Sequence, residues 1–187
     1  MKLLFNIFLL LFLSAPIYAM DSIRGLDGFQ WANIDAVKNA RLHSNMGNIY
    51  FSENNYVSAL REYQIAYNLT KNLNSSSVYL YNMSKCFMKV KNYKLAQDSL
   101  KGAIFKDCMN ITYYDALVDT YIALGEADKE LKNSLNDNIN PYNRIVAGLI
   151  YLKTGRKMAA RTLFDEFISN NPDMLITNDI KVILKKI

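Results

Sequence analysis

The sequence predicts an all-α protein, a superhelix of about four stacked helix pairs with short segments that close its ends. Three observations lead to this prediction. Apolar residues recur at helical spacing along most of the chain, short polar turns separate the helical segments, and one order of small and large side chains returns after about 37 residues. With 51% hydrophobic and 21% charged residues among 187, the chain has the composition of one folded domain.

Residues 1–19 differ from the rest and have the order of a secretory signal peptide. Lys2 precedes an apolar run over residues 3–13, Pro16 follows the run, and the small Ala19 stands at the expected cleavage point. The run is about half of the roughly 20 residues that span a bilayer, so a retained anchor is the weaker alternative. We expect an exported chain without a membrane span, in a bacterial periplasm or cell envelope, or alternatively secreted.

The charge and the cysteine count exclude two further classes of protein. The formal net charge is +5, and its cations are scattered among carboxylates, whereas a nucleic-acid surface needs clustered ones. Two cysteines are too few for a disulfide-dense scaffold. Cys86 and Cys108 are expected to lie on the order of 10 Å apart along their helices, as two isolated thiols.

Residues 20–39 are expected to form an N-terminal segment and the start of the first helix. Phe29 and Trp31 would cover the open end of the stack, with Trp31 as a ligand-binding aromatic as the alternative. Residues 40–172 are expected to form the repeats, and residues 173–187 a C-terminal cap whose helix spans residues 177–187.

The first predicted pair consists of a helix over residues 40–52 and a helix from residue 56. Their apolar faces are Leu42, Met46, Ile49 and Tyr50, and Ala59, Tyr63, Ala66 and Tyr67. Gly47 inside a helix costs about 1 kcal/mol relative to Ala. We expect the close approach of the partner helix at Ala59 to offset this cost, with Tyr50 and Tyr63 filling the space on either side.

The second and third pairs repeat this pattern with different fidelity. The second pair carries Leu80, Met83, Ser84 and Phe87, then Tyr93, Ala96, Leu100 and Ala103. The third begins with Tyr114, Leu117, Val118 and Tyr121, and its second helix has the apolar residues Ala127, Leu131 and Leu135. Glu130 and Ser134 stand where packing residues are expected, which makes this pair the predicted weak point of the stack.

The fourth pair restores the pattern and completes the evidence for a family resemblance. It carries Ala147, Gly148 and Tyr151, a turn at Gly155, then Ala160, Phe164, Phe167 and Pro172. The chain resembles the tetratricopeptide repeat family, whose signature is W-x2-L-G-x2-Y, A-x3-F and P over roughly 34 residues. The matching residues are Met46, Gly47, Tyr50, Ala59 and Tyr63 in the first pair, and Ala147, Gly148, Tyr151, Ala160, Phe164 and Pro172 in the fourth. Unrelated helical hairpins in a bundle are the alternative.

The sequence offers little for catalysis or for a cofactor. Its single histidine, His43, occupies a position that the repeat pattern uses for packing. One histidine and no Cys-x2-Cys leave no usual metal-ligand set, and the isolated glycines form no phosphate-binding loop. We therefore expect a chain that is not an enzyme and holds no metal or cofactor.

The resemblance implies a concave groove lined by the first helix of each pair. The residues expected there are Arg41, Asn48, Tyr81, Asn82, Lys85, Lys89, Asp115, Asp119, Ile145 and Leu149, together with Ser44, Ser52 and Leu152. This surface would run from polar and basic through acidic to apolar; an ordinary solvated helix face is the alternative. One branch of the family grips a C-terminal carboxylate with two asparagines and three cations, but here Ser44, Thr112 and Ala116 occupy the cationic positions. That binding mode is not expected.

Two functions remain open at this stage. The first is a non-catalytic adaptor or scaffold of the cell envelope that binds a peptide or helix of a partner protein in the groove. The second is a structural, self-associating or accessory subunit, favoured by the apolar Ile145, Leu149 and Leu152, which suit a partner surface better than water.

Overall fold

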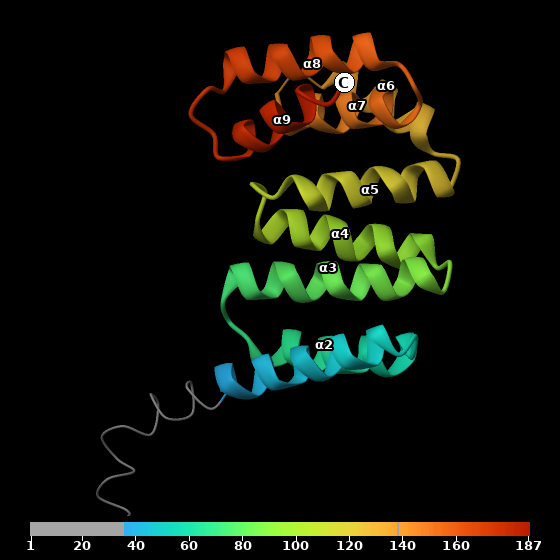
Figure 1. The fold of residues 1–187 in the computed structure, drawn as a ribbon, viewed down its shortest axis with the longest axis vertical. Coiled ribbons are helices and arrows are strands. Elements are labelled where there is room, and N and C mark those ends of the chain that lie inside the picture. Colours follow the sequence, from blue (N-terminus) through green and yellow to red (C-terminus); the bar gives the residue numbers. More distant parts are fainter. Residues whose placement is uncertain (1–35, 138) are drawn as a thin grey trace, which may run out of the picture.

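The computed structural model describes residues 36–137 and 139–187, and the regular structure in this part of the chain is helical (Figure 1). A helix over residues 36–52 comes first. The helices that follow are α2 (Tyr56–Leu69), α3 (Leu73–Lys89), α4 (Tyr93–Lys106), α5 (Ile111–Ala123), α6 (Ala127–Asn136), α7 (Tyr142–Lys153), α8 (Lys157–Asn170) and α9 (Ile176–Leu184). The predicted signal peptide and the segment with Phe29 and Trp31 lie outside the described residues.

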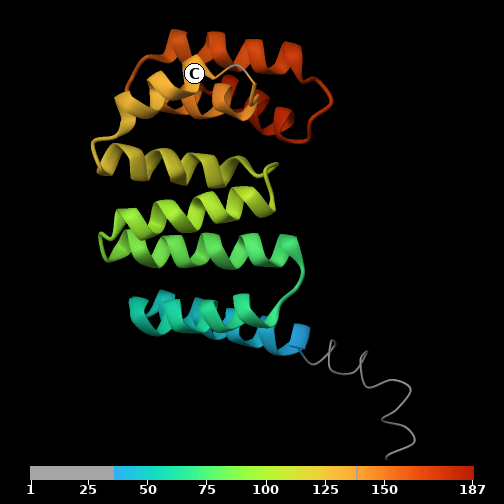
Figure 2. The same cartoon turned by 180° about the vertical axis from the view of Figure 1, so that it is seen from behind.

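Successive helices pair and stack as the sequence predicts. The helix of residues 36–52 pairs with α2, α3 with α4, α5 with α6, and α7 with α8. Views from front and back show the helices lying one above another (Figures 1 and 2). Each second helix also packs on the first helix of the next pair. The all-α superhelix of four helix pairs is confirmed.

The turn inside each pair has one left-handed residue at the equivalent place. These residues are Asn54, Lys91, Gly125 and Gly155, with φ angles of 62°, 61°, 72° and 83°. Lys91 is the one among them whose side chain is poorly suited to this conformation. The interval between them shortens along the chain, so the repeats are not of equal length although their turns are alike.

Asparagines begin the helices in the first half of the described chain. The side chains of Asn55, Asn72, Asn92 and Asn110 accept a hydrogen bond from a backbone N–H in the first turn of α2, α3, α4 and α5. Helices α6 to α9 have no such side-chain cap. Since a cap contributes about 1 kcal/mol, helices α2 to α5 are better secured at their N-terminal ends than α6 to α9.

The glycine of the first pair lies under an aromatic ring. A Cβ atom at Gly47 would lie 2.6 Å from Cε1 of Tyr63, and one at Gly148 would lie 2.5 Å from Cε1 of Phe164. The prediction that Gly47 makes room for Ala59 of the paired helix therefore named the wrong residue. The small residue makes room for the ring, while Ala59, fully buried, belongs to the same crossing.

Other residues occupy these positions in the second and third pairs. Ser84 and Leu100 occupy the equivalent positions in the second pair, and Val118 and Ser134 in the third; all four are buried. In the third pair the larger residue has moved to the first helix. Ser134 is buried, yet it also lines a cavity of about 400 Å³ together with Glu130.

Glu130 explains why the two helices of the third pair, α5 and α6, do not pack closely. It stands where the other second helices carry the fully buried Ala59, Ala96 and Ala160, and it is only partly buried. An unpaired carboxylate resists burial, so α6 cannot approach α5 closely at this point. Helix α6 accordingly packs more on α7 than on α5.

The C-terminal helix closes the stack in a different way from the simple end cap expected. Helix α9 packs on α8 (Figure 1). It also contacts α5, the first helix of the third pair. Ile176 and Ile180 are fully buried. Pro172, expected as a structural residue, follows the end of α8 and is exposed, whereas Tyr50 and Tyr151 are half-buried.

Candidate binding groove

Two neighbouring cavities form a continuous groove along the first helices of the pairs. The first, about 380 Å³, is lined by Phe51, Tyr81, Lys85, Met88, Lys89, Thr112, Asp115, Ala116 and Asp119. The second, about 350 Å³, is lined by Ile111, Thr112, Asp115, Leu149, Leu152, Ile183, Lys186 and Ile187. Because Thr112 and Asp115 line both, we call the whole the first-helix groove.

Helical spacing explains why these side chains meet. Tyr81 and Lys85 are one turn apart on α3, and Asp115 and Asp119 are one turn apart on α5, so each couple faces the same side of its helix. Stacking α3 on α5 then places the two couples next to each other. The structure thus brings together Tyr81, Lys85, Lys89, Asp115 and Asp119, all expected in the groove.

Lys85 is held between two aromatic rings. Its Nζ lies 5.2 Å from the ring centroid of Phe51 and 5.3 Å from that of Tyr81. Burial lowers the pKa of Lys85 from its ordinary value. Among the described residues no carboxylate forms an ion pair with it. Lys85 is therefore a partly desolvated cation in a fixed place, without a neutralising anion from this part of the chain.

The acidic middle of the groove is neutralised from the next pair. Nζ of Lys153, on α7, lies 2.9 Å from Asp115 Oδ1 and 2.6 Å from Asp119 Oδ1. Burial alone would lower the pKa of Lys153, but hydrogen bonds to Asp119 and Asp115 raise it overall. Lys153 was not predicted to line the groove, although it follows Leu149 by one helical turn and so shares its face.

The apolar end of the groove differs from the prediction. Ile145 and Leu149 are 0% and 1% exposed, so the expectation that they face a partner is wrong. Leu149 instead lines the second cavity together with Ile183 and Ile187 of the C-terminal segment. The C-terminal segment thus occupies the place expected for a partner. The second cavity is the space that remains there, and its lining is largely apolar.

The remaining predicted residues lie outside the two cavities. Arg41 is exposed, whereas Asn82 and Ser44 are buried between helices. Asn48 accepts a hydrogen bond of 2.7 Å from the Tyr63 hydroxyl. Burial raises the pKa of Tyr63 to about 12, so this hydroxyl stays protonated and can donate. Asn48 therefore has a structural role, because its hydrogen bond holds the Tyr63 ring over Gly47.

Phe51, Met88 and Thr112 line the groove without having been predicted to do so. Phe51 follows Asn48 by three residues and Met88 follows Lys85 by three, so helical spacing was a usable signal for both. Neither residue was assigned a role from the sequence. Thr112 was considered only as a missing cation.

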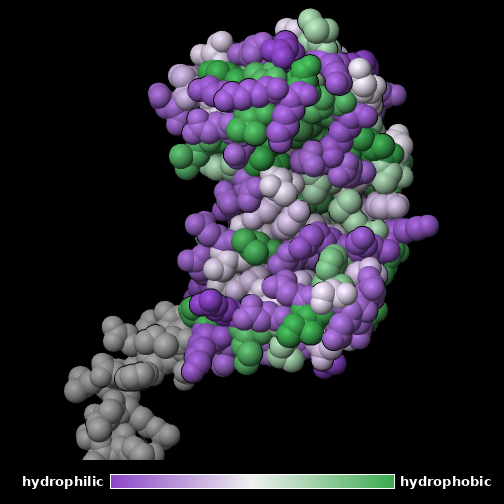
Figure 3. All heavy atoms as spheres, viewed as in Figure 1, coloured by the Kyte–Doolittle hydropathy of each residue, from purple (hydrophilic) through white to green (hydrophobic). Residues whose placement is uncertain are grey.

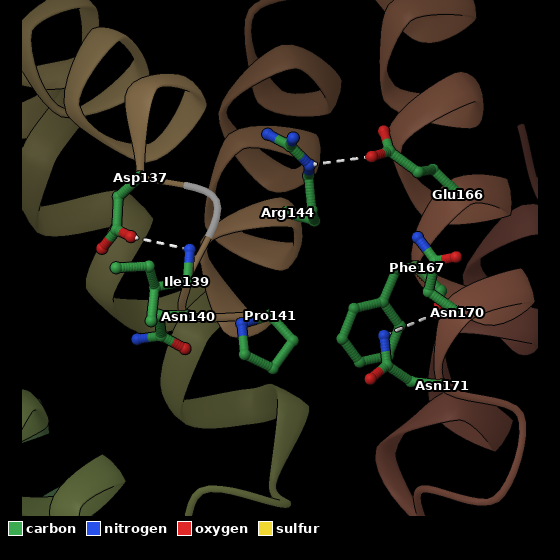
Figure 4. A pocket seen from close by; sticks show the side chains of 9 residues that line it. All are labelled: Asp137, Ile139, Asn140, Pro141, Arg144, Glu166, Phe167, Asn170 and Asn171. Atoms are coloured by element: carbon green, nitrogen blue, oxygen red, sulfur yellow. Dashed lines mark hydrogen bonds and ion pairs between the residues drawn. The ribbon is translucent and has the colours of Figure 1, made fainter.

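A further pocket lies at the connection between α6 and α7 (Figure 4). It has a volume of about 440 Å³ and is lined by Asp137, Ile139, Asn140, Pro141, Arg144, Glu166, Phe167, Asn170 and Asn171. Its polar groups are largely engaged with one another. Nε of Arg144 lies 3.2 Å from Glu166 Oε1, and Asp137 accepts a hydrogen bond from the backbone of Ile139, which lowers the pKa of Asp137.

Several kinds of site are not found in the part of the chain that the structure describes. No group of three His, Cys, Asp or Glu residues there could hold a metal ion, and no helix within residues 36–137 or 139–187 could cross a bilayer. Nδ1 of His43 lies 2.6 Å from Glu62 Oε2, which ties the two helices of the first pair together. Cys86 and Cys108 are both free thiols, as predicted.

Solved structures of other proteins are distantly similar to this chain. Two crystal structures of MamA are similar to this chain with a TM-score of 0.49 each, at 18% and 16% identity, covering 72% and 80% of this chain and 79% and 86% of MamA. TTC0263, a thermophilic TPR protein in Thermus thermophilus, is similar with a TM-score of 0.37 and 17% identity, over 79% of this chain and 97% of that one. No protein-family model matches the chain, and no curated protein sequence matches it.

The fold is tetratricopeptide-like. This conclusion rests on the chain's own geometry, namely four stacked helix pairs, a left-handed residue in the turn of each, and aromatic rings packed over Gly47 and Gly148.

Proposed function

We propose that this chain is a non-catalytic protein-interaction module that binds a peptide or helix of a partner protein in the first-helix groove. The observation that carries the proposal is Lys85, held between Phe51 and Tyr81 without a carboxylate partner in the described chain. A partner's carboxylate would supply the missing charge.

The energetics favour a carboxylate at this position. A cation that has lost part of its water interacts more strongly with an anion than a fully solvated one does. Charge-assisted hydrogen bonds are also about twice as strong as neutral ones. The apolar Phe51, Met88 and Ala116 beside Lys85 would contact the aliphatic or aromatic side chains next to that carboxylate.

Asp115 and Asp119 do not compete for Lys85 because Lys153 already holds them. Their remaining exposed oxygens face the same groove. A partner segment would therefore place its carboxylate over α3 and a polar or basic group over α5. The groove combines a few directed polar groups with apolar contact area, as ligand-binding sites commonly do.

We also propose that the chain acts in the cell envelope. Support comes from the N-terminal order of Lys2, the apolar run over residues 3–13, Pro16 and Ala19, which is typical of a signal for export.

Charge reversal at Lys85 tests the groove. A partner captured from an envelope extract is purified, and its Kd is measured for the wild-type chain, for Lys85→Glu, and for Lys129→Glu as a control with the same charge change on the exposed surface of α6. We expect Lys85→Glu to weaken binding at least about tenfold, roughly 1.4 kcal/mol, and the control to leave it within about twofold. Equal effects of the two variants would place the binding surface elsewhere.

The second candidate is a structural or self-associating role. It now rests on the exposed Phe105 rather than on Ile145, Leu149 and Leu152. Phe105, on α4, is 86% exposed and borders a cavity of about 400 Å³ lined by Tyr114, Tyr121 and Val146 among others. The cavity lies where α6 has withdrawn from α5. If two copies associate here, Phe105→Glu converts a dimer to a monomer in light scattering; a wild-type chain that is monomeric throughout rejects self-association.

A further inference from the structure

The two cavities of the first-helix groove offer different chemistry to a bound segment. The first has Lys85 and Lys89 of α3 in its lining. Figure 3 shows that the surface is indented between the uppermost part of the molecule, which contains α8 and α9, and the part below it. The second cavity is lined mainly by aliphatic side chains from α5, α7 and the C-terminal segment, namely Ile111, Leu149, Leu152, Ile183 and Ile187.

Three lysines of the groove have no anionic partner in the described part of the chain. Lys89 follows Lys85 by one helical turn, so both side chains lie on the same side of α3. Lys186 lines the second cavity. None of the three forms an ion pair with a carboxylate of residues 36–137 or 139–187. Their positive charge is therefore directed at the groove without compensation from these residues.

The aspartates of the groove do not reverse this balance. Asp115 and Asp119 share Nζ of Lys153, at 2.9 Å and 2.6 Å. With Lys153 included, the charged side chains of the two cavities are four lysines and two aspartates, so the groove is net positive. A positive surface of this kind attracts acidic segments and disfavours basic ones.

The second cavity suits a large apolar side chain. It has a volume of about 350 Å³. Leu149 is 1% exposed, and Leu152 and Ile183 are partly buried against the same hydrophobic core. An apolar side chain that enters this cavity loses its contact with water, and such desolvated side chains in pockets are the usual anchors of a protein interface.

We infer that the groove recognises an acidic segment of its partner, with a carboxylate at Lys85 and Lys89 and a large aliphatic or aromatic side chain in the second cavity. Thr112 and Asp115 line both cavities, so one short segment can fill the two places together. The inference rests on the proposed function and specifies the chemistry of the partner. The cations select the charge of the segment, and the apolar cavity fixes its position along the groove.

Selection from a library of random short peptides on the immobilised full chain tests the inference. The selected peptides are expected to share an acidic residue and a large apolar residue at a constant separation. One of them, labelled with a fluorophore, serves as the probe for Kd measurements. Thr112→Trp, which places a bulky side chain where the two cavities meet, should abolish its binding and so identifies peptides that occupy the groove.

Charge reversal tests the acidic position. Lys85→Glu/Lys89→Glu should weaken binding of the probe at least about tenfold, and a new selection on this variant should yield basic residues in place of the acidic one. Lys129→Glu/Lys132→Glu makes the same charge change at exposed positions of α6 and should leave the selection unchanged.

A neutral substitution tests the apolar position separately. Leu152→Gln makes the lining of the second cavity more polar, so selection on it should keep the acidic residue and lose the preference for a large apolar one. Val57→Gln is the matched control, since Val57 is 76% exposed on α2 and lines neither cavity.

The outcomes separate this inference from the proposed function. Peptides that bind in the groove without an acidic residue, or whose acidic residue persists after charge reversal, would overturn the inference and leave the proposed function standing. If no selected peptide loses binding in Thr112→Trp, both fail. Circular dichroism verifies that each variant is folded, and Lys89→Glu alone, at an exposed position, replaces the double variant should that variant unfold.

Discussion

At the residue scale, two crossings of this fold place an aromatic ring against a glycine. Tyr63 lies over Gly47 and Phe164 over Gly148, so a side chain on the first helix has no space at either crossing. Gly47 lowers the helix propensity of its segment, and the buried ring with its hydrogen bond to Asn48 compensates for that loss.

Gly47→Leu is expected to lower the free energy of unfolding by about 2 to 4 kcal/mol, because the new side chain would force the Tyr63 ring and its helix away. Ser84→Gly, at the equivalent position of the second pair, adds no volume and is expected to cost about 1 kcal/mol or less. Urea denaturation followed by circular dichroism compares the two. Equal losses would show that the assignment of equivalent positions is wrong.

Lys91 is expected to be a site of easy stabilisation. Its φ of 61° is unfavourable for a residue with a Cβ atom, whereas Gly125 and Gly155 occupy the same place in later turns. Lys91→Gly should raise the free energy of unfolding by about 0.5 to 1 kcal/mol. Gly155→Ala is the matched reverse change, since a Cβ atom there meets nothing within 4 Å; it should destabilise by a similar amount through backbone strain alone. Chemical denaturation of the two variants measures both changes, and a loss of stability in Lys91→Gly would contradict the strain.

The two thiols are expected to differ in reactivity. Cys86 is 1% exposed, and burial raises its pKa to about 11, so very little reactive thiolate forms near neutral pH. Cys108 is half-buried and lines the cavity beside α6. Iodoacetamide at mildly alkaline pH should label Cys108 in the native chain and leave Cys86 unmodified, as read by peptide mass. Labelling of Cys86 at the same rate would contradict the packing of α2 on α3.

At the element scale, α6 is the least secured helix of the stack. It has 10 residues, no side-chain cap, and Glu130 in place of the small residue that lets the other pairs close. Stability in a solenoid is approximately a sum over repeats and their interfaces, so one poor interface lowers protection locally. The withdrawal of α6 also leaves the cavity beside Phe105 open.

Hydrogen exchange should therefore find α6 opening first. Amides of residues 126–136 are expected to exchange well before those of residues 56–67, whose helix is capped by Asn55 and packs closely on α3. Mass spectrometry of peptides at increasing exchange times measures the order. The reverse order would remove the argument that the third pair is the weak interface.

Helix α9 and the segment after it occupy part of the surface that was expected to bind a partner. Its residues Ile176 and Ile180 are fully buried, and the segment after it helps to close the apolar end of the first-helix groove. The helix predicted over residues 177–187 is present as α9, although it ends at Leu184. The sequence could not predict that this helix reaches α5, because a helical pattern gives a face but not the neighbour that the face meets.

At the scale of the whole molecule, the repeat pattern predicts the fold and part of the groove. Small and large residues at fixed offsets indicate helix pairs, and the polar residues left on α3 and α5 do line a common cavity. Ile145, Leu149 and Asn82 were assigned to the groove because the repeat pattern left their faces free; their burial depends on contacts between pairs. The ion pairs of Lys153 with Asp115 and Asp119 span two helices far apart in sequence and depend on how the stack is twisted.

The central claim is that a partner protein lies in the first-helix groove, and site-specific photo-cross-linking tests it most directly. A photoreactive residue is placed at Thr112, which lines both cavities, and, in a matched chain, at Asp98, an exposed residue of α4 outside them. Illumination of cells that express each chain is expected to give a discrete adduct from Thr112 and none from Asp98. An adduct from Asp98 alone, equal adducts from both, or none from either would contradict the account.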